Sequence, residues 1–220
     1  MQQIAEQWLT IGEARLSRRR VVGGAVAGGG ALALVAAVPG LSRAQDATPA
    51  ASPAAGFGSD VDVLNYALTL EHLEYAFYRD GVDLFDFGTD GFGFAINDQL
   101  AAIRDHEAVH VQTLTAVIGQ LGGTPVAEGT YKFDDAYASD SAFLKTAMAL
   151  ENTGVQAYDG AGQFLRDPAL LTAAGTIVAV EARHASYLNL INDKAPFPAA
   201  FEKPLTMAQV LKIAGPFLAS

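Results

Sequence analysis

The sequence contains no cysteine. This absence excludes disulfide bonds, iron–sulfur clusters, thiolate zinc sites, a catalytic thiol and a lipid-modified cysteine anchor. Any metal ion must therefore be held by carboxylates and imidazoles. Charged residues are also few, at 17% of the chain, whereas hydrophobic residues make up 50% of its 220 residues. A chain of this length and composition can bury the core of one globular domain.

Basic residues are scarce in the body of the chain. Five of the 14 lysines and arginines lie within the first 44 residues, so that residues 45–220 carry 9 basic and 22 acidic side chains, a net charge of −13. Such a surface repels nucleic acid and anionic membranes and attracts cations. We therefore expect metal cations as partners and no nucleic acid.

Residues 1–44 have the features of an export signal. The motif SRRRVV at residues 17–22 precedes a Gly/Ala/Val/Leu stretch that runs to Val38, and residues 42–44 (SRA) offer a small-residue cleavage site. The motif resembles a twin-arginine signal, whose cargo crosses the membrane already folded. Glycines dilute the apolar stretch, which favours a cleaved signal over the alternative, an uncleaved anchor. We expect a periplasmic, cell-surface or extracellular protein without stable membrane insertion after cleavage.

The remaining chain is predicted to be all-α. Residues 45–59 are rich in Ala, Pro and Ser and indicate a flexible linker. Apolar residues then recur at helical spacing in four segments, and no convincing run of strict alternation predicts a strand. The predicted helices span about residues 60–79, 96–121, 141–165 and 169–192, with Asp60 as the N-cap of the first.

The connections predict an antiparallel four-helix bundle over residues 60–193. Only residues 166–168 separate the third and fourth helices, which requires a tight turn. Residues 122–140 are longer and rich in Gly, Pro and Asp, as expected of a crossover along the bundle. Residues 194–220 form a C-terminal extension, in which we expect a short helix at about 205–218.

The four predicted helices repeat one arrangement of polar residues. The first and third each carry a lone Glu followed seven residues later by Tyr, and the second and fourth each carry Glu-x-x-His. With four His and nine Glu in 220 residues, chance predicts about 0.16 Glu-x-x-His pairs, yet two occur on predicted helices. In chain order the residues are Glu71, Tyr78, Glu107, His110, Glu151, Tyr158, Glu181 and His184.

This repeat predicts a site for two metal ions. A spacing of three places Glu and His on one helix face, about one turn apart, so that both reach one ion. Two such helices and two single-Glu helices supply six ligands, namely Glu71, Glu107, His110, Glu151, Glu181 and His184. Carboxylate-rich sites with one imidazole per ion suit iron or manganese more than copper or zinc. The alternative, solvated or core polar groups without a metal, leaves four carboxylates unneutralised in an apolar core.

A second motif overlaps the first. His106-Glu107-x-x-His110 is also the His-Glu-x-x-His signature of zinc proteases, in which both histidines bind zinc and the glutamate is the base. The nearest downstream third ligand, Glu128, lies in a Gly/Pro-containing stretch without a predicted helix. This interpretation also leaves the second Glu-x-x-His pair unexplained.

Several neighbouring residues have alternative roles. Glu74 is the main rival of Glu71 as ligand from the first helix, although Glu71 alone matches the repeat. His72 and His106 each adjoin a proposed ligand and point about 100° away from it, which favours the surface or contact with a ligand over metal binding. Tyr78 and Tyr158, the candidate catalytic side chains, lie two turns beyond their glutamates, where a phenol can hydrogen-bond a ligand or pass an electron. Filling the core is the favoured role for both, because aromatics at this spacing usually pack there.

The ligand pattern resembles that of the ferritin-like superfamily over about residues 60–193. The stretch LEHLEYAFY at residues 70–78 is similar to secreted ferritin-like proteins that are grouped with plant desiccation-related proteins. The resemblance implies the same six ligands around two iron or manganese ions. The superfamily includes ferroxidases, rubrerythrin-like peroxidases and manganese catalases, so that fold and ligands do not fix the reaction. The chain lacks the cysteines of a rubredoxin domain.

Two classes of function follow. One is an oxidoreductase that oxidises ferrous iron or consumes peroxide, with dioxygen or peroxide as partner, in oxidative or desiccation stress. The other is a non-catalytic protein of the cell envelope that binds metal or is purely structural. A homo-oligomer is compatible with either, whereas a linker and a C-terminal extension argue against a storage cage.

Overall fold

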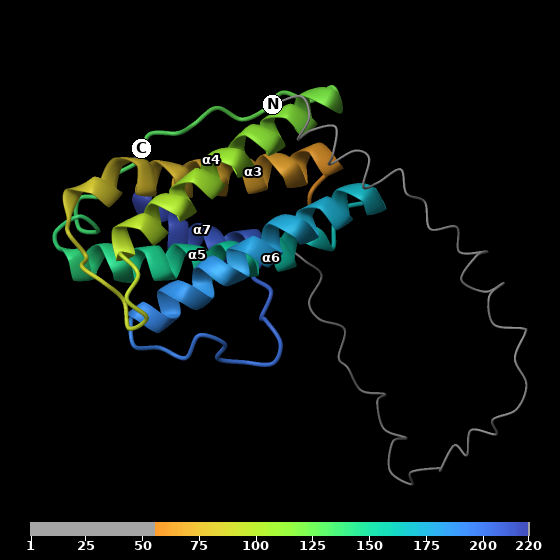
Figure 1. Ribbon diagram of the computed structural model, residues 1–220. Helices are drawn as coiled ribbons and strands as arrows, with labels where there is room; N and C mark the ends of the chain where they lie inside the picture. The colour runs from red at the N-terminus through yellow and green to blue at the C-terminus, as the bar shows by residue number, and fades with distance from the viewer. Residues whose placement is uncertain (1–55, 220) are drawn as a thin grey trace, which may run out of the picture.

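The computed structural model describes residues 56–219, which form a helical bundle without a named strand (Figure 1). The predicted signal and residues 45–55 of the predicted linker lie outside the described residues. The helices are α3 (Asp60–Gly81), α4 (Ile96–Gln120), α5 (Asp140–Gly162), α6 (Pro168–Ile191) and α7 (Met207–Ala214), with 3-10 turns η1 (Val82–Leu84) and η2 (Gly215–Phe217). The prediction of an all-α fold is confirmed. Within residues 56–219 no helix is both long enough and apolar enough to span a bilayer.

The start of α3 differs from the sequence prediction. Ser59, not Asp60, is the N-cap, and its side chain accepts a hydrogen bond from the backbone N–H of Asp62 (3.2 Å). The Asp60 carboxylate instead accepts hydrogen bonds from the backbone N–H groups of Arg166 (2.9 Å) and Asp167 (3.0 Å) in the turn before α6. The prediction of Asp60 as N-cap was therefore wrong. Its hydrogen-bond partners lie more than 100 residues away, and local sequence cannot reveal such partners.

The bundle is antiparallel within each consecutive helix pair. Leu64 and Leu68 near the start of α3 pack with Val117 near the end of α4, whereas Phe77 near the end of α3 belongs to the same cluster as Leu100 near the start of α4. α5 and α6 are paired in the same way after a short turn, and the four long helices lie along one another (Figure 1). Each long helix therefore has one face that packs against the other three long helices.

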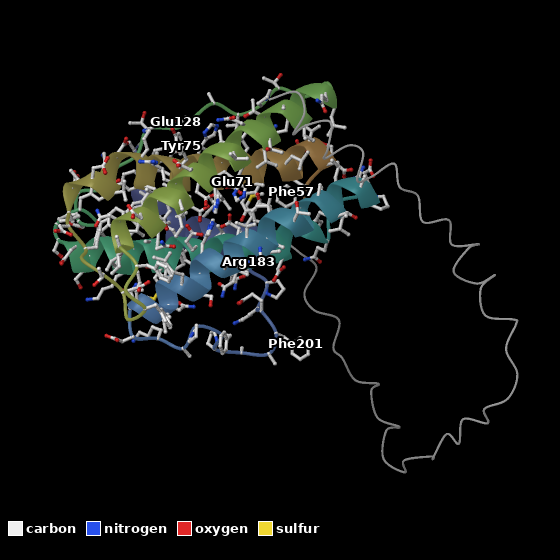
Figure 2. The ribbon with its side chains drawn as sticks, viewed as in Figure 1. Phe57, Glu71, Tyr75, Glu128, Arg183 and Phe201 are labelled. Atoms are coloured by element: carbon white, nitrogen blue, oxygen red, sulfur yellow. The ribbon has the colours of Figure 1, made fainter. Side chains whose placement is uncertain are left out.

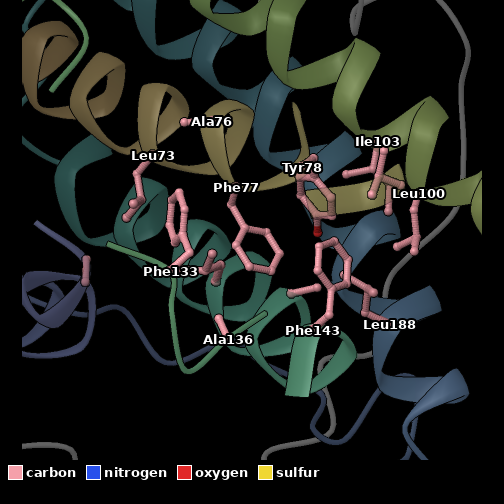
Figure 3. Packing of buried hydrophobic residues seen from close by; sticks show 14 of the residues in the cluster. Leu73, Ala76, Phe77, Tyr78, Leu100, Ile103, Phe133, Ala136, Phe143 and Leu188 are labelled. Atoms are coloured by element: carbon pink, nitrogen blue, oxygen red, sulfur yellow. The ribbon is translucent and has the colours of Figure 1, made fainter. Parts of the chain in front are cut away.

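Two apolar clusters fill the two ends of the bundle. The larger contains Phe77, which stacks on Phe143 with ring centroids 4.5 Å apart, and Tyr78, which lies among Leu100, Ile103 and Phe143 (Figure 3). The smaller contains buried residues of α3, α4 and α6, namely Leu64, Ala67, Leu68, Leu114, Val117, Ile118, Leu170 and Ile177. Burying each large apolar side chain contributes roughly 1.5–3 kcal/mol. The clusters close both ends of the space between the helices against water.

The C-terminal segment packs on α5 rather than extending freely. The backbone N–H of Leu205 donates to the carbonyl of Gln156 (3.0 Å), and Gly160 passes so close that a Cβ there would overlap the Leu205 carbonyl. A capping box between Thr206 and Gln209 then begins α7. The helix is shorter than predicted because it changes to a 3-10 turn at Gly215–Phe217, which contains a proline.

Candidate metal centre

Six polar side chains from four helices meet between the two apolar clusters. The four glutamates among them are 0% exposed, and the two histidines are 8% and 5% exposed. Glu71, for example, lies between the helices, whereas Arg183 lies on the outer side of α6 (Figure 2). The six residues are those that the repeat singles out, Glu71, Glu107, His110, Glu151, Glu181 and His184.

The six side chains form two overlapping groups. Each group offers four ligand atoms that lie within 4.8 Å of one another, which is close to the spacing of atoms bound to one metal ion. The first group is Glu71, Glu107, His110 and Glu181, and the second is Glu107, Glu151, Glu181 and His184. Glu107 and Glu181 belong to both groups, so their carboxylates lie between the two sets of ligand atoms. Each group takes three residues from one helix pair and one from the other.

The first group is centred on one imidazole nitrogen. His110 Nδ1 lies 2.9 Å from Glu107 Oε2, 3.1 Å from Glu181 Oε1 and 3.2 Å from Glu71 Oε2. One Nδ1–H points in a single direction and cannot satisfy three carboxylate oxygens. A cation among these atoms can satisfy all of them.

The second group has the same form and leaves polar atoms unpartnered. His184 Nδ1 lies 3.1 Å from both Glu107 Oε1 and Glu151 Oε2. Among the described residues, however, Glu107 Oε1 and both oxygens of Glu181 are buried without a hydrogen-bond partner. Such atoms are rare in folded proteins because each costs about 1–3 kcal/mol. The unpartnered oxygens belong to the two residues that the groups share.

Without a cation, the buried carboxylates and imidazoles of the site have strongly shifted pKa values. Burial, followed by the charges of Glu107 and Glu151, raises the pKa of Glu181 well above its usual range, and burial raises the pKa of Glu107 to about 7. Burial lowers the pKa of His184, but its close contacts with the negative carboxylates of Glu107 and Glu151 outweigh this effect and raise the pKa to about 10. The pKa of His110 is raised in the same way. Protons thus neutralise part of the site.

Glu71 is the exception among these carboxylates. Burial disfavours its charge, but the positive charge of His110 and hydrogen bonds outweigh burial and lower its pKa. Four carboxylates and two neutral imidazoles carry a charge of −4, which two divalent cations balance. Oxygen-rich ligands with one imidazole per ion suit iron or manganese. The residues present therefore fit a pair of such ions.

The two tyrosines of the repeat cross between the helix pairs. Tyr78 of α3 donates a hydrogen bond to Glu151 Oε1 of α5 (2.8 Å), and Tyr158 of α5 donates to Glu71 Oε1 of α3. Burial and the neighbouring carboxylates raise both tyrosine pKa values well above the usual range, so both phenols stay protonated donors. Each tyrosine thus orients a glutamate of the opposite pair, and Tyr78 fills the core as well.

Glu74 lies beside the six residues but outside both groups. It is 3% exposed, and burial, followed by the charges of Glu181 and Glu151, raises its pKa well above the usual range. The repeat places Gly154 three residues after Glu151, as Glu74 is three after Glu71. A Cβ at Gly154 would lie 3.0 Å from Glu74 Oε1 and 3.2 Å from Glu181 Oε2. The glycine makes room for a carboxyl that only one half of the repeat carries.

The structure does not support the zinc-protease interpretation. His106 is outside both groups, and its Nδ1 lies 2.9 Å from His184 Nε2. Glu128, the candidate third ligand, forms an ion pair with Arg79 (2.9 Å) at the surface. Burial, followed by the charges of His184 and His110, lowers the pKa of His106, so that this ring is neutral near pH 7. Sequence reasoning placed His106 near a ligand without identifying His184 as its partner.

His72 is buried rather than at the surface. It is 8% exposed, and its Nε2 lies 3.2 Å from the carbonyl oxygen of Val126 in the crossover between α4 and α5. This contact holds the crossover against α3. No spacing in the sequence links His72 to Val126, so periodicity alone could not have found the contact.

The family profile of the ferritin-like domain matches residues 59–194. This range contains the four long helices and all six candidate ligands. Comparison with curated proteins finds no match to the chain. The similarity to secreted and desiccation-related proteins is therefore a proposal rather than a finding. The match covers more than half of the sequence, and with the helical bundle it shows that the chain belongs to the ferritin-like domain family.

Proposed function

We propose that the protein is an exported oxidoreductase whose ligand groups would hold two iron or manganese ions, and that it either passes electrons from ferrous iron to dioxygen or consumes peroxide. The observation that carries this proposal is the sharing of Glu107 and Glu181 by both ligand groups. Glutamates shared by both ligand groups would hold two bound ions close together, which would favour reactions that need two electrons at one place. A pair of iron or manganese ions supplies these as one change of oxidation state at each ion.

The side chains around the centre have distinct tasks in this proposal. Glu71 and His110 would hold one ion, Glu151 and His184 would hold the other, and the shared glutamates would contribute to both positions. The two tyrosines orient the unshared glutamates. The apolar clusters at either end exclude bulk water, which strengthens every charge interaction at the site.

The enclosure of the site favours a very small substrate. All four glutamates are fully buried. A cavity beside Glu74, Thr153 and Gly154 has about 10 Å³ of space for the centre of a water-sized molecule, which is roughly what one water requires. Dioxygen and hydrogen peroxide approach this size, whereas an organic substrate does not.

The same enclosure also favours a second candidate, a metal-binding protein of the cell envelope without turnover. Fully buried carboxylates that are closed at both ends by apolar residues retain an ion well and exchange it slowly. In this case the ions contribute to folding stability, and no substrate needs to enter. Export through the twin-arginine-type signal and a role in oxidative or desiccation stress are common to both candidates and remain proposals.

Metal content and turnover separate the candidates. The protein is purified after export, its iron, manganese and zinc are measured, and ferrous oxidation and peroxide loss are followed before and after metal removal. We expect two ions per chain and metal-dependent turnover, both lost in Glu107→Gln. Glu128→Gln, a surface glutamate, is the matched control. Two bound ions without turnover would support the envelope candidate, and no bound iron or manganese would refute both.

A further inference from the structure

His184 uses both of its ring nitrogens. Its Nδ1 faces Glu107 and Glu151 at 3.1 Å, and its Nε2 lies 2.9 Å from Nδ1 of His106. The planes of the two imidazole rings are inclined by only 11°. His106 belongs to α4 and is exposed, so this contact links the buried site to the surface of the bundle.

The contact between the histidines has a defined polarity when a cation is bound. The ring nitrogen that binds a cation carries no hydrogen, so a His184 ring bound through Nδ1 carries its hydrogen on Nε2. That N–H then donates to Nδ1 of His106, which accepts the bond as a neutral ring with its own hydrogen on Nε2. The bond fixes both the tautomer and the orientation of His184, as partners of metal-bound histidines commonly do.

The other half of the repeat has no such partner. Val180 precedes Glu181 as His106 precedes Glu107, and its apolar side chain cannot accept a hydrogen bond. Among the described residues, the hydrogen-bond partners of His110 are Glu71 and Glu107, and both bonds are made by Nδ1. The two ligand groups are therefore alike in composition but differ in how their imidazoles are held.

We propose that His106 is a positioning residue for His184 and that it makes the second ligand group bind a cation more tightly than the first. The inference rests on the proposed metal centre and goes beyond it, because it assigns unequal affinities to the two positions. An imidazole that is already held in the tautomer and orientation needed for metal binding loses less conformational freedom when a cation binds. Removing such a partner commonly weakens metal affinity about 10- to 100-fold.

Cobalt(II) titration of the full, metal-free chain tests this difference by calorimetry and visible absorption. Glu71→Gln removes a ligand of the first group only, so the remaining tight position contains His184. Glu151→Gln removes a ligand of the second group only, so the remaining position contains His110. We expect His106→Ala to weaken cobalt binding about 10- to 100-fold in the Glu71→Gln background and to leave it unchanged in the Glu151→Gln background.

Rescue and control variants separate positioning from a general structural effect. His106→Asn places an amide oxygen near the position of Nδ1, and we expect it to restore most of the affinity. His72→Ala removes a histidine that contacts the Val126 carbonyl rather than a ligand, and should spare cobalt binding. An unchanged affinity in His106→Ala, an equal loss in both backgrounds, or no rescue by asparagine would overturn the role of His106 alone. Failure of the unsubstituted chain to bind cobalt, manganese or iron would overturn the metal centre itself.

Discussion

The hydroxyl of Tyr78 on α3 donates a 2.8 Å hydrogen bond to Glu151 on α5. The reverse pair is also present, since Tyr158 on α5 donates to Glu71 on α3. Each half of the chain therefore orients a candidate ligand of the other half. Because both phenols are held protonated by burial and by the neighbouring carboxylates, the bonds persist across the neutral pH range.

Removal of either phenol is expected to weaken one ion position. In Tyr78→Phe the aromatic ring still fills the core, but Glu151 loses its donor, so the affinity of the second group should fall about 10-fold. Tyr158→Phe should have the same effect on the first group through Glu71. Calorimetric manganese titration measures both constants. Tyr137→Phe, whose hydroxyl bonds to the carbonyl of Phe77, is a control that should leave both affinities unchanged.

Substitution of a glutamate that belongs to both ligand groups should reduce the number of bound ions more than substitution of a glutamate that belongs to one group. Glu181 belongs to both groups, so Glu181→Gln is expected to weaken both ions and to leave fewer than one per chain after dialysis. Glu71 belongs to one group, so Glu71→Gln should retain about one ion. Elemental analysis of the two dialysed variants decides the point. Equal stoichiometries would contradict the bridging arrangement.

The metal-free protein should lose stability as pH rises from about 5 to about 10. Glu107, with a pKa near 7, and His184, with a pKa near 10, bind protons more tightly when folded than when unfolded. Groups whose pKa is raised by folding stabilise the protein below their unfolded pKa, and this stability is lost as pH rises through the folded pKa. Glu71, whose pKa is lowered, contributes constantly above its unfolded value.

Thermal unfolding followed by circular dichroism measures this effect. The metal-free chain should show a falling midpoint over that range, whereas the manganese-loaded chain should show a much flatter profile because cations replace the protons. A rising midpoint of the metal-free protein would mean that the carboxylates are not buried together.

Two glycine-to-alanine substitutions should have opposite effects. A Cβ at Gly154 would lie 3.0 Å from Glu74 Oε1, so Gly154→Ala should displace this carboxyl or Glu181, destabilise the fold and weaken metal binding. A Cβ at Gly175, on the exposed side of α6, would have no atom within 4 Å. Gly175→Ala should therefore stabilise the helix by about 0.5–1 kcal/mol. Urea unfolding of both variants tests the contrast, and two similar results would argue against crowding at Glu74.

The helices and the convergence of the candidate ligands were predictable because both depend on local spacing. The long helices begin and end within three residues of the predicted positions, since apolar periodicity and Gly or Pro signals define them. The internal repeat supplied the register that brings Glu71 and Glu151 to the same level of the bundle. The ferritin-like fold is confirmed by the family match.

Other features were not predictable because they depend on which helices become neighbours. Asp60 was assigned to its own helix but bonds to the turn before α6. The partner of His106 is 78 residues away, and that of Tyr78 is 73 residues away. Apolar periodicity predicts which face of each helix points inward, but it does not predict which side chain of another helix contacts a given residue. The roles of the six ligands and of the export signal stay predictions.

Each ligand group draws on both helix pairs, as expected if the two halves of the chain are related by an approximate twofold axis. Two copies of one helix hairpin, packed about a twofold axis, would place equivalent glutamates, histidines and tyrosines around the same centre. Joining the copies in one polypeptide frees their equivalent positions to diverge. The two halves differ at equivalent positions, where Glu74 corresponds to Gly154 and His106 corresponds to Val180. A fully symmetric arrangement would give two identical ligand groups, whereas the two groups of this chain differ in how their imidazoles are held.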